Sequence, residues 1–99
     1  MPAGDTDDLV FAFIARIPVA GVDAFRGYEN VVLPVLSDYG ARLQRRLHND
    51  DGTIEVHILS FPSATALEGY RKDMRRLAVS ALLEASGAKI ELIAVRDVI

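Results

Sequence analysis

The sequence predicts an α+β fold in which a four-stranded antiparallel sheet carries helices on one face only. Three observations support this prediction. Apolar residues recur at alternating positions in four short stretches, they recur at helical spacing in two longer stretches, and glycine or proline separates most of these stretches. Their order along the chain is strand, helix, strand, strand, helix, strand.

Length and composition indicate one small domain spanning residues 1–99. A chain this short buries only about 60 to 65% of its unfolded surface, so association is expected to add to its core. The net charge of −3 disfavours nucleic acid as a partner, and no apolar run is long enough to cross a membrane. The acidic start, MPAGDTDD, differs from a secretory signal, and residues 1–7 are expected to be flexible. We therefore expect a cytoplasmic protein, and the absence of cysteine is compatible with that location.

The first strand and the first helix are expected between residues 9 and 40. Residues 9–17, LVFAFIARI, are apolar on both alternating sets, which is typical of a central strand covered on both faces. From residue 22 to 39 the apolar residues change to helical spacing. Pro34 cannot donate a backbone hydrogen bond, so a kink is expected before it, and Gly40 is expected to end the helix in the left-handed conformation.

Residues 41–49 and 53–61 are expected to form a β-hairpin, with Asp-Gly at positions 51 and 52 as the turn. Two registers are open. A two-residue turn places His48 opposite Glu55 and Arg46 opposite His57, whereas a four-residue loop places Arg46 opposite Glu55.

In either register the same residues share a face, because the side-chain period of a strand is two. We expect one face to be apolar and to pack against the helices: Leu43, Leu47, Ile54, Val56 and Ile58. We expect the opposite face to be polar: Arg42, Gln44, Arg46, His48, Glu55 and His57.

A corner at Pro62-Ser63 leads from the hairpin into the second helical region, and Ser63 is the expected N-cap. Helical spacing then continues to residue 86, as one long helix or as two helices broken near Asp73. Gly87 is the expected C-terminal cap, and residues 88–98 form the last strand. The complete order, β-α-β-β-α-β, is the ferredoxin-like or split βαβ arrangement.

The sheet face without helices is expected to carry apolar residues as well as the polar residues of the hairpin. We assign to it Val10, Ala12 and Ile14 or their alternates, Leu59, Phe61, Ile93 and Val95. An apolar area of this size favours a partner over water, and the simplest partner is a second copy packed sheet on sheet about a two-fold axis. The sequence thus predicts a homodimer through the sheet face.

The segment YENVVLPVLSDYGARLQRRLHNDDGTIEVHILSFPSATALEGYRKD resembles the dimeric α+β barrel superfamily. It is most similar to an uncharacterised family neighbouring the antibiotic-biosynthesis monooxygenases. The resemblance covers residues 9–97 and is carried by several elements: the helix ending in Pro34 and Tyr39-Gly40, the strand from Val56 to Leu59, the Phe61-Pro62-Ser63 corner, Tyr70 and Asp73.

The resemblance implies a homodimer that forms an α+β barrel, with a ligand cleft between sheet and helices. Members of the superfamily include cofactor-free oxygenases, haem-degrading enzymes and isomerases. The haem-degrading branch is associated with a Trp and a His acting together, and this chain has no Trp. Fold resemblance transfers architecture better than chemistry.

His57 is the candidate catalytic residue. It is predicted to lie in mid-strand, within one cross-strand step of Arg46 or Glu55, where it would act as a general base or bind an anionic substrate. The alternative is a paired histidine in the dimer interface. His48 lies near the turn, where solvent exposure is expected, and the hairpin offers no defined third ligand for a two-histidine metal site.

Aromatic residues at helical spacing are expected to line a pocket between sheet and helices, where phenolic hydroxyls orient a ligand. The candidate ligand-binding residues are Tyr28, Tyr39, Phe61, Tyr70 and Arg42. Core packing is the alternative explanation for the aromatic residues. Glu29 and Asp38 flank this wall, and either becomes a candidate base if it is desolvated.

A basic run, Arg71, Lys72, Arg75 and Arg76, follows in the second helical region. Like charges four residues apart repel on a helix, so something is expected to offset the repulsion. An anionic ligand is one candidate, and the neighbouring acids Glu68 and Asp73 are the other.

These observations lead to a small homodimeric protein that binds a small organic ligand between sheet and helices, without metal, haem or another cofactor. The chain has no GxGxxG, P-loop, HExxH or nucleophile-elbow motif. The first alternative is a cofactor-free monooxygenase or isomerase that acts on an aromatic or polyketide-like substrate, with His57 as the base. The second is a structural or regulatory interaction module.

Overall fold

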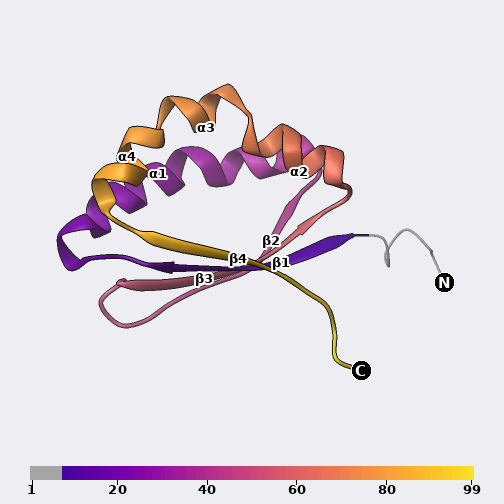
Figure 1. Cartoon of the computed structure of the whole chain (residues 1–99), viewed down its shortest axis with the longest axis horizontal. Helices are drawn as coiled ribbons and strands as arrows, with labels where there is room; N and C mark the ends of the chain where they lie inside the picture. Colours follow the sequence, from indigo (N-terminus) through magenta and orange to yellow (C-terminus); the bar gives the residue numbers. More distant parts are fainter. Residues whose placement is uncertain (1–7) are drawn as a thin grey trace.

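The structure, a computed structural model that describes residues 8–99, has a four-stranded antiparallel sheet with helices on one face (Figure 1). The strands are β1 (Leu9–Arg16), β2 (Arg42–His48), β3 (Ile54–Phe61) and β4 (Lys89–Val95). The helices are α1 (Val22–Val35), α2 (Ala64–Arg71), α3 (Met74–Ala78) and α4 (Ser80–Ser86), with short 3-10 helices η2 (Val19–Gly21) and η3 (Leu36–Tyr39). The expected flexibility of residues 1–7 lies outside the described residues.

The sheet has the strand order β2-β3-β1-β4, so β1 and β3 occupy its centre. All three strand pairs are antiparallel. This topology confirms the predicted ferredoxin-like α+β fold, including the central position of the strand that is apolar on both alternating sets. No helix within residues 8–99 is long and apolar enough to cross a membrane, and the cytoplasmic location stays a prediction.

The helix ends follow the residues that were expected to set them. Pro34 lies in the last turn of α1, and the chain then tightens into η3 before Gly40 adopts φ 68°. The Ser63 hydroxyl caps α2 by accepting a hydrogen bond from Ala66 N at 3.0 Å. The second helical region breaks at Lys72 and Asp73, as one of the two alternatives predicted, and changes again between α3 and α4.

The hairpin has the register predicted for the shorter turn, with His48 opposite Glu55 and Arg46 opposite His57. A bulge at Gln44 then shifts the pairing. Arg45 lies opposite Ile58, and the next residue of β3, Leu59, lies opposite Leu43 instead of Gln44. One extra residue in a strand reverses the side-chain alternation beyond it. Leu43 and Arg46 therefore point to the same side of the sheet.

The predicted faces of β3 were wrong, and so were those of Arg46, His48 and Leu47 in β2. Leu43 faces the helices and Arg42 faces the other side, as predicted. Glu55, His57, Leu59 and Phe61 point toward the helices, and His57 is only 2% exposed. Ile54, at the start of the same strand, is 41% exposed on the face without helices. The prediction placed apolar residues inside by default, but Leu59 and Phe61 belong to the core and fix the strand's orientation. Since the period is two, Glu55 and His57 must follow them inward.

The face without helices carries a broad apolar surface, here called the open face. Residues paired across antiparallel strands lie on the same side of the sheet, which defines the open face by its register. Its apolar residues are Val10, Ala12, Ile14, Leu47, Ile54, Val56, Ile58, Ile93 and Val95. The assignment of Val10, Ala12, Ile14, Ile93 and Val95 to this face was correct, and that of Leu59 and Phe61 was wrong. Figure 1 shows every helix on the opposite side.

The core lies between helices and sheet in two clusters. One cluster packs the end of α1 and η3 against β3 and α2: Val35, Leu36, Ala41, Leu59, Phe61 and Tyr70. The other packs the start of α1 against β1: Ala15, Ile17, Phe25, Tyr28 and Val32. Phe13 contacts both clusters. Side chains from β3, α1 and β2 between these clusters are charged or ionisable, and they form the candidate site.

Candidate functional site

A buried polar cluster joins the sheet to helix α1. Glu29 comes from α1, Glu55 and His57 come from β3, and Arg46 comes from β2. His57 Nε2 lies 2.6 Å from Glu55 Oε2 and 3.2 Å from Glu29 Oε2. Arg46 donates to Glu29 Oε1 at 3.0 Å, and its Nε lies 3.5 Å from Glu55 Oε2. The four side chains thus form one network, in which both carboxylates contact both cationic groups.

The network compensates for the burial of its charges. Glu29, Glu55 and His57 are each at most 4% exposed, and buried charges are destabilising unless they are paired. Two carboxylates facing Arg46 and a protonated His57 sum to zero charge. The His57 ring also stacks on Phe13, with ring centroids 4.7 Å apart and an interplanar angle of 14°. Stacking and pairing together fix the plane of the imidazole.

The pKa values of the two glutamates are shifted in opposite directions. Burial alone would raise the pKa of Glu55, but hydrogen bonds with His57 and Glu29 and the charges of His57 and Arg46 lower it to about 2. Burial is also the largest influence on Glu29, and there it prevails, so the pKa of Glu29 is raised. Burial acts to lower the pKa of His57, but the two carboxylates outweigh it and raise that pKa. Carboxyl groups with divergent pKa values are suited to different roles in one site.

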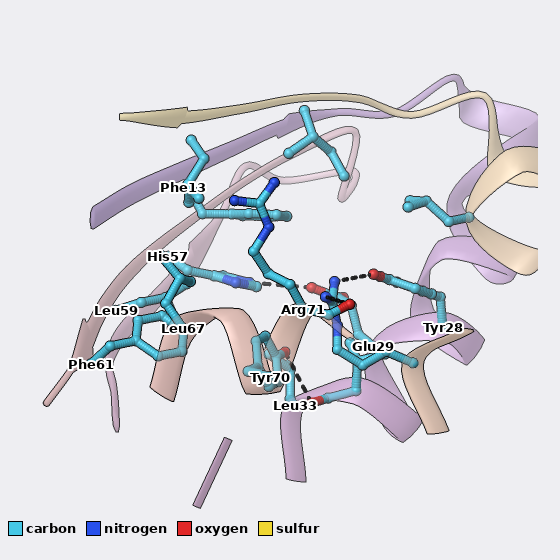
Figure 2. Close-up of a pocket in the computed structure, with 15 residues that line it drawn as sticks. Phe13, Tyr28, Glu29, Leu33, His57, Leu59, Phe61, Leu67, Tyr70 and Arg71 are labelled. Atoms are coloured by element: carbon cyan, nitrogen blue, oxygen red, sulfur yellow. Dashed lines mark hydrogen bonds and ion pairs between the residues drawn. The ribbon is translucent and has the colours of Figure 1, made fainter. Parts of the chain in front are cut away.

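A cavity of about 240 Å³ lies beside this cluster, between the helices and the sheet (Figure 2). This volume is far above the roughly 10–15 Å³ needed to hold one water molecule. Its wall is mostly aromatic and aliphatic: Phe13, Tyr28, Val32, Leu33, Leu59, Phe61, Leu67, Tyr70, Leu83, Ile90 and Leu92. Its ionisable residues are Glu29, His57, Arg71 and Arg76, with the Tyr hydroxyl groups.

Only one side of the polar cluster reaches the cavity. Glu29 and His57 belong to its wall, whereas Glu55 and Arg46 stand behind them. One oxygen of Glu29, Oε2, is buried 3.2 Å from His57 Nε2, whereas Glu55 Oε2 lies closer, at 2.6 Å. Glu29 is therefore the carboxyl group of the cluster that reaches the cavity, and Glu55 holds His57 in place.

The structure brings three of the five candidate ligand-binding residues to the cavity. Tyr28, Phe61 and Tyr70 line it. Tyr70 also donates a hydrogen bond to the Val32 carbonyl at 3.1 Å, and burial raises the pKa of its hydroxyl to about 12. Its hydroxyl is thus a neutral donor that already has an acceptor.

The other two candidates lie elsewhere. Tyr39 donates to Asp73 Oδ2 at 2.6 Å and is absent from the cavity wall, and this hydrogen bond raises the pKa of Tyr39. Arg42 pairs with Ser60 on the side of the open face and is exposed. Asp38, weighed as a possible base, forms an exposed ion pair with Arg75 at 2.8 Å. These three residues do not meet the cavity.

His57 is buried within the monomer, so the alternative of a histidine in the sheet-face interface is wrong. Helical periodicity did not identify Glu29 as a central residue of the site. It lies on the buried side of α1, and the sequence signal was its position one residue after Tyr28 and three before Val32, both on the apolar stripe.

A metal ion would find three ligand atoms here. His57 Nε2 and one oxygen each from Glu29 and Glu55 lie within 4.8 Å of one another. Arg46 already contacts both carboxylates, and a metal ion would have to compete with this cation and with the His57 proton. The geometry of the described residues therefore favours a protonated ion-pair network over a metal centre, and the absence of a cofactor stays a prediction.

Comparison with known proteins identifies relatives by fold alone. No family model and no curated protein matches the sequence. Among solved structures, a proposed antibiotic biosynthesis monooxygenase from Bacteroides thetaiotaomicron aligns over 95% of this chain and 92% of its own, with TM-score 0.80 and 11% identity. A second protein of that description, from Nitrosomonas europaea, covers 93% of this chain and 91% of its own, with TM-score 0.76 and 10% identity.

A NIPSNAP domain protein from Burkholderia xenovorans aligns over 90% of this chain and 93% of its own, with TM-score 0.65 and 18% identity. At such identities the similarity concerns the backbone and not the chemistry. The resemblance to proteins neighbouring the antibiotic-biosynthesis monooxygenases is thereby confirmed at the level of the fold. The chain shares the ferredoxin-like α+β fold of monooxygenase-like and NIPSNAP proteins.

Proposed function

We propose that this protein is a homodimer that binds a small, largely apolar organic molecule in the cavity between helices and sheet. The observation that supports this proposal best is the composition of the cavity wall. Aromatic and aliphatic side chains surround a space of about 240 Å³, and Glu29 and His57 supply polar groups at one place in it. Small-molecule sites have this composition, in which apolar contacts provide affinity and a few polar groups provide orientation.

Glu29 supplies the main polar contact to the ligand. Burial raises the pKa of this carboxyl group, which makes it a stronger proton acceptor than an exposed glutamate, and its Oε2 lies 3.2 Å from His57 Nε2. A ligand hydroxyl placed beside Glu29 would donate a hydrogen bond to this carboxyl group.

The homodimer is supported by the open face. Its apolar residues come from all four strands, and several are largely exposed, including Ile93 at 43% and Ile54 at 41%. Apolar patches of this extent on small proteins are typically covered by a partner. A second copy fits because a two-fold axis places one open face against the other, as two sheets pack in a sandwich.

The ligand site is tested with a pair of tryptophan variants on one helix. Leu83→Trp adds a ring to the cavity wall, whereas Leu82→Trp adds the same ring to a residue that is 38% exposed and does not line the cavity. The chain contains no other Trp, so each variant also carries a single fluorophore. We expect 2-naphthol to bind wild type and Leu82→Trp, and to bind Leu83→Trp at least tenfold more weakly. Equal affinity for the two variants would place the ligand outside this cavity.

The dimer is tested with two lysine substitutions at exposed apolar residues. Ile93→Lys places a charge on the open face, and Val31→Lys places one on α1, where Val31 is 37% exposed. Native mass spectrometry at micromolar concentration should give a dimer for wild type and Val31→Lys, and a monomer for Ile93→Lys. A monomeric wild type contradicts the proposed assembly.

The second candidate function is a cofactor-free enzyme, a monooxygenase or isomerase acting on an aromatic or polyketide-like substrate. The observation that favours it is a carboxyl group of raised pKa in the wall of an apolar cavity, next to a histidine. Such a carboxylate removes a proton from a carbon adjacent to a carbonyl, and the same group can return that proton at another position. Isomerisation of this kind requires no other reactant, whereas oxygenation also requires O2.

Proton abstraction is tested with 2-tetralone in D2O. If the enzyme candidate holds, wild type accelerates exchange of the protons next to the carbonyl, as followed by proton NMR, and Glu29→Gln does not. His57→Ala should also abolish the acceleration if His57 takes part in proton transfer, while the dimer stays folded. No acceleration by wild type above the buffer rate would count against this candidate and leave the binding function.

A further inference from the structure

Most of the basic run, Arg71, Lys72, Arg75 and Arg76, is paired with carboxylates of the described residues. Arg75 pairs with Asp38 at 2.8 Å and with Asp73 at 2.9 Å, and Lys72 pairs with Glu68 at 3.4 Å. Since the helix breaks at Asp73, the repulsion expected along a continuous helix is also relieved. Arg76 differs, because no carboxylate of residues 8–99 lies within ion-pair distance of it.

Arg76 is nonetheless held firmly at the cavity wall. It donates from Nη2 to the Tyr28 hydroxyl at 2.7 Å and from Nη1 to the Arg71 carbonyl at 3.4 Å. Its guanidinium carbon lies 4.5 Å from the centre of the Tyr70 ring. Figure 2 shows Tyr28, which accepts the first of these hydrogen bonds, on the side of the cavity away from Phe61. These contacts orient the guanidinium without balancing its charge.

One donor of Arg76 is left without a partner. The Nε atom is buried and makes no hydrogen bond within the described residues. An unpaired buried donor on a charged group is more costly than a neutral one, so a native protein is expected to satisfy it with something. The Tyr28 hydroxyl accepts from Arg76, and its own hydrogen remains available for donation to a neighbouring acceptor.

The cavity wall therefore holds one guanidinium, that of Arg76, without a carboxylate partner among residues 8–99, and the Tyr28 hydroxyl lies beside it. The matching group is a single anion with two oxygens, and a carboxylate has this geometry for a guanidinium partner. A doubly charged phosphate would bring more negative charge than one buried arginine compensates. The rest of the cavity matches an aromatic or aliphatic body.

We propose that the ligand is a small monocarboxylic acid with an apolar body, and that its carboxylate binds Arg76 and Tyr28. This inference rests on the proposed function, and it adds the chemical class of the ligand. Glu29 and His57 then contact the part of the ligand that lies farther along the cavity.

The inference is tested by titrating 2-naphthoate and its uncharged counterpart 2-naphthamide into the dimeric full-length protein by calorimetry. Wild type should bind 2-naphthoate at least tenfold more tightly than 2-naphthamide. Arg76→Met removes the guanidinium but keeps an unbranched apolar side chain, and it should lose 10- to 100-fold in affinity for 2-naphthoate, while affinity for 2-naphthamide changes less than threefold. Lys72→Met removes the same charge from a largely exposed residue that does not line the cavity, and it should bind both compounds like wild type.

Tyr28→Phe and Arg76→Lys provide independent readouts if Arg76→Met folds poorly. Each should weaken 2-naphthoate selectively, because the first removes the hydroxyl donor and the second removes Nε while keeping the charge. Equal affinity of wild type for the two compounds, or a parallel loss of both in Arg76→Met, overturns the carboxylate site and leaves the proposed cavity intact. Binding of neither compound to wild type overturns the proposed function as well.

Discussion

Replacing Glu29 by glutamine removes one negative charge from the buried cluster and keeps the size of the side chain. His57 is protonated more readily than a free histidine because two carboxylates face its Nε2, at 2.6 Å and 3.2 Å. In Glu29→Gln, Glu55 is the one carboxylate of these two that still faces His57. An opposite charge within about 4–6 Å shifts a pKa by about 1–3 units. Glu29 lies farther from His57 Nε2 than Glu55 does, and its own pKa is raised, so its effect is expected at the lower end of this range. We therefore expect the pKa of His57 to fall by about 1 unit in Glu29→Gln, which corresponds to about 1.4 kcal/mol.

The assay is a pH titration of the histidine Cε1–H resonances by NMR. The chain contains two histidines, so the spectrum is simple, and His48→Gln assigns the second resonance. Asp38→Asn is the matched control, since it removes one charge from an exposed pair with Arg75 and should shift the pKa of His57 by less than about 0.3 units. An unchanged or increased pKa of His57 in Glu29→Gln would refute the proposed charge coupling.

Three further predictions concern stability. Gly21→Ala should destabilise the fold by about 3 kcal/mol in urea unfolding, because a Cβ at Gly21 would lie 1.8 Å from the Ser86 carbonyl oxygen and neither backbone can yield. Gly27→Ala should instead stabilise the fold by about 1 kcal/mol, because Gly27 lies within α1 and the added Cβ would meet the Leu82 side chain of α4 at an ordinary contact distance of 3.6 Å. A destabilised Gly27→Ala would contradict this packing of α1 against α4. Because folding raises the pKa of His57, its contribution to stability is complete below about pH 6.5 and is lost as pH rises through the folded-state value. Urea unfolding between pH 6 and 9 should show this decline in wild type and a smaller one in His57→Gln, and equal slopes would contradict it.

Much of the fold followed from local signals. Ser63, Gly40 and Gly87 mark helix ends through chemistry that involves a few neighbouring residues, and the structure places them as predicted. The register of the hairpin also agrees with the prediction. The loop that closes it is longer than the two-residue Asp51-Gly52 turn, since Gly52 N donates to the Asn49 carbonyl and Asn49 pairs with Ile54. Such features depend on backbone conformation within one turn, so a single sequence is sufficient to find them.

The orientation of β3 did not follow, because it depends on contacts between distant residues. Both alternating sets of β3 contain apolar residues, and hydrophobicity alone favoured Ile54 and its companions as the inner set. The competing set includes Glu55 and His57, which become acceptable inside only when Glu29 and Arg46 meet them. Glu29 is separated from β3 by η3, β2 and a turn. The same long-range pairing assembles the candidate site, which explains why its central carboxyl group was underestimated.

The bulge at Gln44 has a consequence for how insertions and deletions act on this protein. In a regular strand Leu43 and Arg46, three positions apart, would lie on opposite sides of the sheet, and the bulge at Gln44 places them on the same side. Deleting Gln44 while the turn keeps its register would therefore remove the bulge and leave Leu43 opposite Leu59 and Arg46 opposite His57. Deleting Leu47 or His48 would instead carry Arg46 to the open face and leave Glu29 without its guanidinium partner. The position of a deletion in β2 thus decides whether the cavity wall keeps its charge.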